Sequence, residues 1–141
     1  MSGPPPITLQ LTWQGELRFA GRSGDVELTL DGDRKAGPSP VQALAFALAG
    51  CMAIDVLHVL TKGRLGLEGL RARLTAERAP EEPRRLVKVD LHFLVTGDVP
   101  PDRVKRAIAL SREKYCSVWH SLRQDIDFTT SYEIRRKEVA R

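Results

Sequence analysis

The run AFALAGCMAIDVLHVL, residues 45–60, constrains this chain more than any other segment. It is almost unbroken in apolar residues, yet it carries Cys51, Asp55 and His58. At about 100° per residue, spacings of four and three place these side chains on one face of a helix. Lys62 falls on the same face at the next turn. This polar face indicates either a functional site or a set of satisfied core groups.

Residues 41–60 are also the one candidate for a membrane span. An Asp near the middle of such a span costs roughly 2.5–3.5 kcal/mol, and His58 adds to that cost. The chain begins MSGPPPITLQ, which has neither the basic nor the apolar segment of a secretion signal. We therefore expect a buried helix in a cytoplasmic protein with no membrane contact.

Alternating apolar and polar residues predict the strands. Four runs show this pattern clearly, at residues 7–13, 25–32, 67–79 and 84–97, and residues 126–136 show it less regularly. Residues 16–20 are expected as a hairpin partner, because they follow the first run after Gln14-Gly15. Pro40, with Ser39 as its N-cap, begins a helix that runs to about Lys62. Pro101 begins a second helix, whose packing stripe consists of Val104, Ile108, Ser111, Tyr115, Val118 and Leu122. The expected fold is α+β, with antiparallel strands in the order β-β-β-α-β-β-α-β. The length of 141 residues fits a single domain over residues 1–141.

The chain contains two cysteines, Cys51 and Cys116. Without an export signal, a permanent structural disulfide is not expected. The two residues are then either small buried hydrophobes or a transient redox pair.

A metal site would need more ligands than the two thiols. Cys51 with His58 and Cys116 with His120 form a donor set that binds zinc in other proteins. Seven residues of helix rise by ~10 Å, so Cys51 and His58 do not easily reach one ion, whereas Cys116 and His120 could. We expect no metal and no other cofactor.

Two segments carry a resemblance to a known family. SPVQALAFALAGCMAIDVLHVLTKGR (39–64) and LSREKYCSVWHSL (110–122) resemble the two signature helices of the OsmC/Ohr family. The strand order also matches that family's, from about Leu11 to Ile134. The resemblance implies an intertwined homodimer around long central helices, with two sites at the subunit interface. It further implies thiol-dependent reduction of hydroperoxides, especially organic ones.

Mapped by motif, the resemblance implies that Cys51 is the peroxidatic thiol and Cys116 the resolving thiol. Cys51 would reduce an organic hydroperoxide, or hydrogen peroxide as a further substrate, and become a sulfenic acid. Condensation with Cys116 would give a disulfide, which an external dithiol would reopen.

One departure separates this chain from the family's peroxidases. These carry a Glu directly after the Pro that begins the helix, and the Glu orients a catalytic Arg; here the position is Val41. The chain thus resembles a branch that lacks this Glu. Arg22, in FAGRSGD, is the best match for the catalytic Arg, although a turn residue explains it equally well. Asp55 could hold Arg22 or Lys62 near the thiol, or bond to His58.

Three functions remain open from the sequence. The preferred hypothesis is a thiol peroxidase. An OsmC-like small-molecule-binding protein without peroxidase activity is favoured by Val41. Nucleic-acid binding rests on the sequence pI of about 9.4 alone, because no basic helix face or aromatic stacking string is present, and we expect no nucleic-acid partner.

Overall fold

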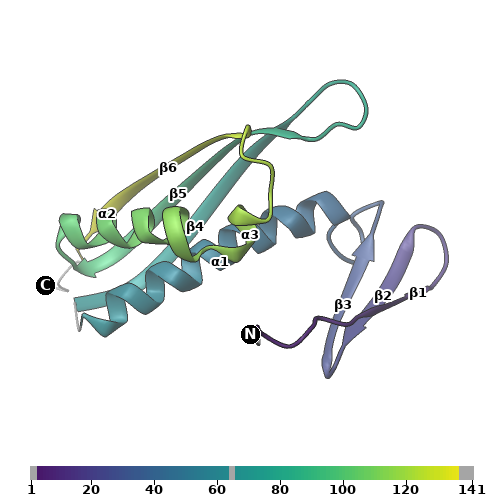
Figure 1. Cartoon of the computed structure of the whole chain (residues 1–141), viewed down its shortest axis with the longest axis horizontal. Coiled ribbons are helices and arrows are strands. Elements are labelled where there is room, and N and C mark those ends of the chain that lie inside the picture. Colours follow the sequence, from purple (N-terminus) through teal and green to yellow (C-terminus); the bar gives the residue numbers. More distant parts are fainter. Residues whose placement is uncertain (1–2, 64–65, 137–141) are drawn as a thin grey trace, which may run out of the picture. The chain divides into compact units, whose positions relative to one another are not determined.

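The computed structural model describes residues 3–63 and 66–136. The elements follow in chain order as β1 (Gln10–Trp13), β2 (Arg18–Ser23), β3 (Val26–Asp31), α1 (Pro40–Lys62), β4 (Gly66–Arg78), β5 (Leu86–Asp98), α2 (Pro101–Leu110), η1 (Ser111–Tyr115), α3 (Ser117–His120) and β6 (Asp127–Arg135) (Figure 1). The α+β class and the order of six strands around two helical segments are confirmed. Contacts divide the chain into two compact units, Met1–Leu44 and Ala45–Arg141, so a single domain over residues 1–141 stays a prediction.

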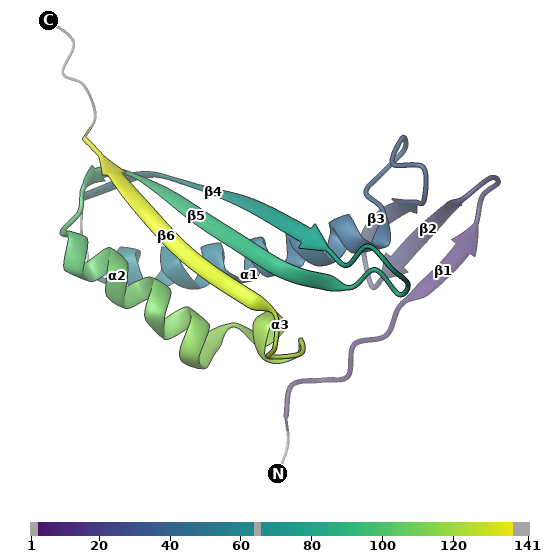
Figure 2. The same ribbon diagram turned by 90° about the horizontal axis from the view of Figure 1, so that it is seen from above.

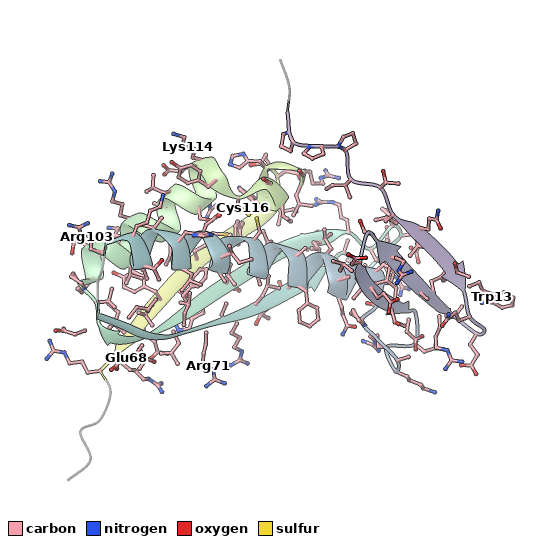
Figure 3. The ribbon with its side chains drawn as sticks, turned by 90° about the horizontal axis from the view of Figure 1, so that it is seen from below. Trp13, Glu68, Arg71, Arg103, Lys114 and Cys116 are labelled. Atoms are coloured by element: carbon pink, nitrogen blue, oxygen red, sulfur yellow. The ribbon has the colours of Figure 1, made fainter. Side chains whose placement is uncertain are left out.

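The first unit is an antiparallel meander in the order β1-β2-β3, as the alternation predicts. Leu11, Gly21 and Leu28 lie opposite one another across the three strands, so apolar residues gather on one face. That face is open to solvent, and Trp13 points outward at the end of β1 (Figure 3). The large exposed apolar side chains of residues 3–31 are Ile7, Leu9, Leu11, Trp13, Leu17, Phe19, Val26 and Leu28.

The buried Asp31 orders the loop that leads from β3 to α1. Its carboxylate accepts hydrogen bonds from the backbone N–H groups of Ala36 (2.9 Å), Asp33 (2.9 Å) and Lys35 (3.3 Å). These bonds, led by that from Ala36, lower the pKa of Asp31 from its usual range. Its own N–H donates to Pro38 O at 3.0 Å. The Asp31 carboxylate therefore satisfies three backbone donors of this loop.

The predicted N-cap of α1, Ser39, is confirmed, and it forms a capping box with Gln42. The Gln42 N–H donates to Ser39 Oγ at 3.2 Å, and the Ser39 N–H donates to Gln42 Oε1 at 3.0 Å. Two backbone donors of the first turn are thereby satisfied. Gln42, which closes this box, directly follows Val41. Val41 occupies the position at which the family resemblance implies a Glu in the peroxidases.

Three stripes run along α1. The first is buried and consists of Leu48, Met52, Val56 and Leu60, at helical spacing. The second holds the polar residues of the opening motif. The third is apolar but exposed, with Phe46, Ile54 and Leu57 at its centre. By length and composition alone α1 could cross a membrane, but the core helix of a soluble protein passes the same test. The buried stripe packs into the core of the second unit, which favours a core helix over a membrane span.

The second unit contains a three-stranded sheet in the order β4-β5-β6. The helices α1 and α2 lie on one face of this sheet (Figures 1 and 2). Strand β5 turns alternate side chains to that face, and four of them are completely buried: Val89, Leu91, Phe93 and Val95. They form the core together with the buried stripe of α1 and residues of α2.

Two predictions about the C-terminal half need correction. Strand β6 pairs with β5 in parallel, not antiparallel, because the helical segment between them returns the chain to the start of β5. The second helix also does not run unbroken to Leu122. It changes to a π-helical turn at Ser111–Tyr115, and Cys116 is extended (φ −73°, ψ 97°) before α3 begins. The Cys116 N–H donates to Ser111 O at 2.8 Å, an i→i+5 bond that closes the π turn.

Candidate functional site

The structure brings the two cysteines together, although 65 residues separate them in the sequence. Cys51 lies within α1, and Cys116 lies in the break between the π turn and α3, beside α1 (Figure 3). Their Sγ atoms and a carboxylate oxygen of Asp55 all lie within 4.8 Å of one another. The polar face of α1 therefore meets the break in the second helical segment at a cluster of two thiols and one carboxylate.

Ser111 holds the carboxylate of this cluster in place. Its hydroxyl donates to Asp55 Oδ2 at 2.7 Å, and Ser111 itself is completely buried. Sequence reasoning placed Ser111 only on the packing stripe of the second helix. A hydroxyl within an otherwise apolar stripe was the signal that it had a polar partner across the interface.

Cys116 is a buried thiol with a raised pKa. Burial is the largest cause, and the neighbouring Cys51 and Asp55 add to it because they disfavour a further negative charge. The Trp119 N–H donates to Cys116 Sγ at 3.3 Å and acts in the opposite direction. The net result raises the pKa to about 11. Cys116 is therefore protonated at neutral pH, while Cys51 is half-buried and lies closer to solvent.

An aromatic pair fixes the backbone donor beside Cys116. The rings of Trp119 and Phe128 are 4.5 Å apart between centroids, tilted by 47°. The guanidinium of Arg112 lies 4.7 Å from the Phe128 ring centroid and 5.9 Å from that of Trp119. These contacts hold α3 against β6 and keep the Trp119 N–H aimed at the sulfur.

The other predicted site residues lie outside this cluster or in the other unit. Arg22 is on β2 of the first unit, where its guanidinium forms an exposed ion pair with Glu27 at 3.2 Å. His58 and Lys62 share the polar face of α1 with Asp55, but both are exposed. The ion pairs of residues 3–63 and 66–136 do not include Asp55, whose described partner is Ser111. Catalytic roles for Arg22 and Asp55 stay predictions.

Asp55→Asn is expected to lower the pKa of Cys116. The substitution removes a negative charge beside the thiol but leaves its burial, the larger cause, unchanged. Compared with the same background carrying Asp55, the pKa of Cys116 should be lower in Asp55→Asn and still lie above the ordinary range of cysteine. The measurement is a pH titration of thiolate absorbance in a Cys51→Ser background, where one thiol titrates. Ser111→Ala, which keeps the charge, is the matched control. An unchanged pKa in Asp55→Asn would show that the carboxylate is not charged beside the sulfur.

Comparison with known proteins gives both family and fold. The family profile described as OsmC-like protein matches residues 31–131 of this chain. Protein YhfA of Escherichia coli K12 is 40% identical over 128 residues, which cover 89% of this chain and 96% of YhfA.

Solved structures of similar fold cover nearly the whole chain. A hypothetical protein from Aquifex aeolicus VF5 matches with a TM-score of 0.87 and 24% identity, over 95% of this chain and 99% of that one. An organic hydroperoxide resistance protein OsmC from Legionella pneumophila matches with a TM-score of 0.70 and 18% identity, over 94% and 99% of the two chains. At these identities the likeness is one of fold.

Proposed function

The chain belongs to the OsmC-like family, and on that premise we propose that it is a cysteine-based peroxidase for organic hydroperoxides. The observation that carries the proposal is the pair of sulfur atoms, Cys51 Sγ and Cys116 Sγ, within 4.8 Å of each other. A peroxidatic thiol needs a second thiol at short range to condense with its sulfenic acid. The hydroperoxide resistance protein from Legionella shares the fold, which supports a redox function in stress defence.

The reaction assigns a different step to each thiol. The Cys51 thiolate attacks the terminal oxygen of ROOH, the O–O bond breaks, and the alkoxide takes a proton and leaves as ROH. Cys51 is thereby oxidised by two electrons to a sulfenic acid. The Cys116 sulfur then attacks the Cys51 sulfur, water leaves with the proton of Cys116, and a disulfide forms. An external dithiol reduces this disulfide by exchange and restores both thiols.

The environments of the two sulfurs support this order. Cys116 is completely buried and protonated at neutral pH, since its pKa is about 11, so it is a poor first nucleophile. Cys51 is the more accessible of the two. Cys116 therefore remains a protonated thiol until Cys51 has become a sulfenic acid, which is electrophilic and close enough to react with it.

We further propose that the working unit is a homodimer acting in the cytoplasm. The exposed apolar stripe of α1, with Phe46, Ile54 and Leu57, is too extensive to leave in water. The meander of the first unit also exposes one apolar face. A second copy of the chain would cover both surfaces, as the family resemblance implies.

The test is thiol titration of the reduced protein before and after one equivalent of an organic hydroperoxide. We expect two free thiols before the addition and none after it, with one equivalent of the alcohol formed and both thiols recovered on treatment with a dithiol. Two unreacted thiols would reject the peroxidase. Uptake of the peroxide without its reduction would then favour the small-molecule-binding alternative, which Val41 supports.

A further inference from the structure

We propose that the reduced cluster of Cys51, Asp55 and Cys116 binds a thiophilic divalent metal ion such as Zn²⁺, and that oxidation to the disulfide releases it. Binding requires only the reduced thiols, whereas release by a hydroperoxide rests on the proposed function. The site would then couple metal occupancy to the redox state of the two cysteines.

The distances within the cluster are close to those of a tetrahedral zinc site. Zn–S bonds of about 2.3 Å and Zn–O bonds of about 2.1 Å place two ligands of one ion roughly 3.6–3.8 Å apart. The two sulfurs and the carboxylate oxygen already lie within 4.8 Å of one another. Small side-chain movements therefore bring three donors onto one ion. The fourth position would be left to a water molecule.

This donor set differs from the one that the sequence suggested. The distance along α1 between Cys51 and His58 argued against a metal, and His58 and His120 are both exposed. Asp55 stands one turn from Cys51 and supplies the third ligand in place of a histidine. The break after the π turn brings Cys116 to the same point, which an unbroken helix would not have done.

Charge and orientation also favour a cation at this point. Two thiols and a carboxylate share a small, largely buried volume, and the ion pairs of the described residues include none of them. A divalent cation would displace the two thiol protons and neutralise the resulting thiolates. The hydrogen bonds from Ser111 to Asp55 and from the Trp119 N–H to Cys116 resemble the outer-shell bonds that orient metal ligands.

Electrons and protons balance when release of the ion is combined with the peroxidase reaction. Two metal-bound thiolates give up two electrons and form the Cys51–Cys116 disulfide. The hydroperoxide accepts these electrons with two protons from solvent and becomes alcohol and water. The disulfide sulfurs are weak ligands, so the ion leaves.

The test uses Co²⁺ as a spectroscopic probe and Zn²⁺ in competition with a chromophoric chelator, on the reduced full-length protein. We expect a sulfur-to-cobalt charge-transfer band, tetrahedral d–d bands and one Zn²⁺ per chain. Cys51→Ser, Cys116→Ser and Asp55→Asn should each weaken Zn²⁺ binding, by more than the roughly 10–100-fold typical of losing an outer-shell partner. Ser111→Ala should weaken it about 10-fold. His58→Ala, on the same face of α1 but outside the cluster, should bind as the wild type does.

Absence of the charge-transfer band, or unchanged Zn²⁺ binding in both cysteine variants, would overturn the site. Circular dichroism and thermal melting of each variant establish that it is folded. Diamide, which oxidises dithiols without peroxidase chemistry, should release the metal. Release by diamide but not by an organic hydroperoxide would keep the metal site and reject the proposed peroxidase.

Discussion

Cys51→Ser is expected to abolish hydroperoxide reduction, whereas Cys116→Ser is expected to complete one turnover and stop. A serine hydroxyl does not attack the O–O bond at neutral pH, so the first variant loses the bond-breaking step. The second variant keeps that step but has no thiol within 4.8 Å of Cys51 to resolve the sulfenic acid. With a dithiol as reductant, we expect the steady-state rate of Cys51→Ser to fall at least about 100-fold, or ~2.7 kcal/mol in activation free energy.

Single-turnover experiments separate the two roles. Cys116→Ser should consume one equivalent of hydroperoxide and carry a sulfenic acid on Cys51, detectable by mass spectrometry after trapping with a 1,3-diketone. Excess hydroperoxide should then convert it to the sulfinic acid. Cys51→Ser should consume none. Ser117→Ala, an exposed change next to Cys116, is the matched control and should retain full activity.

The opposite result for the two cysteine variants would assign the two thiols to the opposite steps. If Cys51→Ser consumed one equivalent and Cys116→Ser none, the order of the two thiols would be reversed, despite the burial of Cys116. Full activity of both variants would remove the sulfur pair from the mechanism.

Local periodicity predicted most of the elements because each depends on nearby residues. The α1 helix from Pro40 to Lys62 has a proline start, a Ser39–Gln42 capping box and sustained apolar spacing, all of which are visible in the sequence. The meander follows from alternation in the same way. Strand ends differed by a few residues, as for β1, expected from Ile7 and observed from Gln10.

Contacts between segments distant in the sequence could not be predicted from periodicity. Spacing alone left Cys51 and Cys116 as either buried hydrophobes or a redox pair, and their pairing came only from the family resemblance. The bond from Ser111 to Asp55 spans 56 residues, so nothing local requires it. The π turn contains neither Gly nor Pro, which explains why the stripe through Ser111 and Tyr115 read as a continuous helix.

The exposed apolar stripe of α1 marks a second limit of sequence reasoning. A sequence with apolar residues on two stripes of one helix predicts a helix that is buried on both. In the structure, residues 3–63 and 66–136 of one chain cover only the stripe that contains Leu48 and Met52. Phe46 is 71% exposed, Ile54 56% and Leu57 43%. Monomeric proteins rarely leave such large neighbouring side chains in water. The exposure of this stripe therefore indicates that a second copy of the chain covers it in the proposed homodimer.

Ile54→Glu is expected to convert the proposed homodimer into a monomer. In a two-fold symmetric dimer each copy contributes the same surface, so one substitution introduces two carboxylates into the interface. Burying an unpaired charge there is strongly unfavourable. We expect the dimer dissociation constant to rise at least about 100-fold, or ~2.7 kcal/mol. Sedimentation velocity at micromolar concentration measures the change. Ile54→Leu, which keeps an apolar side chain of the same size, is the control and should remain dimeric.

Two outcomes would reject this interface. A wild-type chain that sediments as a stable folded monomer at micromolar concentration would show that the stripe is left open in water. A fully dimeric Ile54→Glu would place the contact between copies elsewhere on the molecule. Ile54 lies three residues from Cys51 on α1, so Ile54→Glu places a carboxylate near the thiol as well as in the interface. A folded monomeric Ile54→Glu that still consumes one equivalent of hydroperoxide would therefore show that the sulfur pair works within one chain.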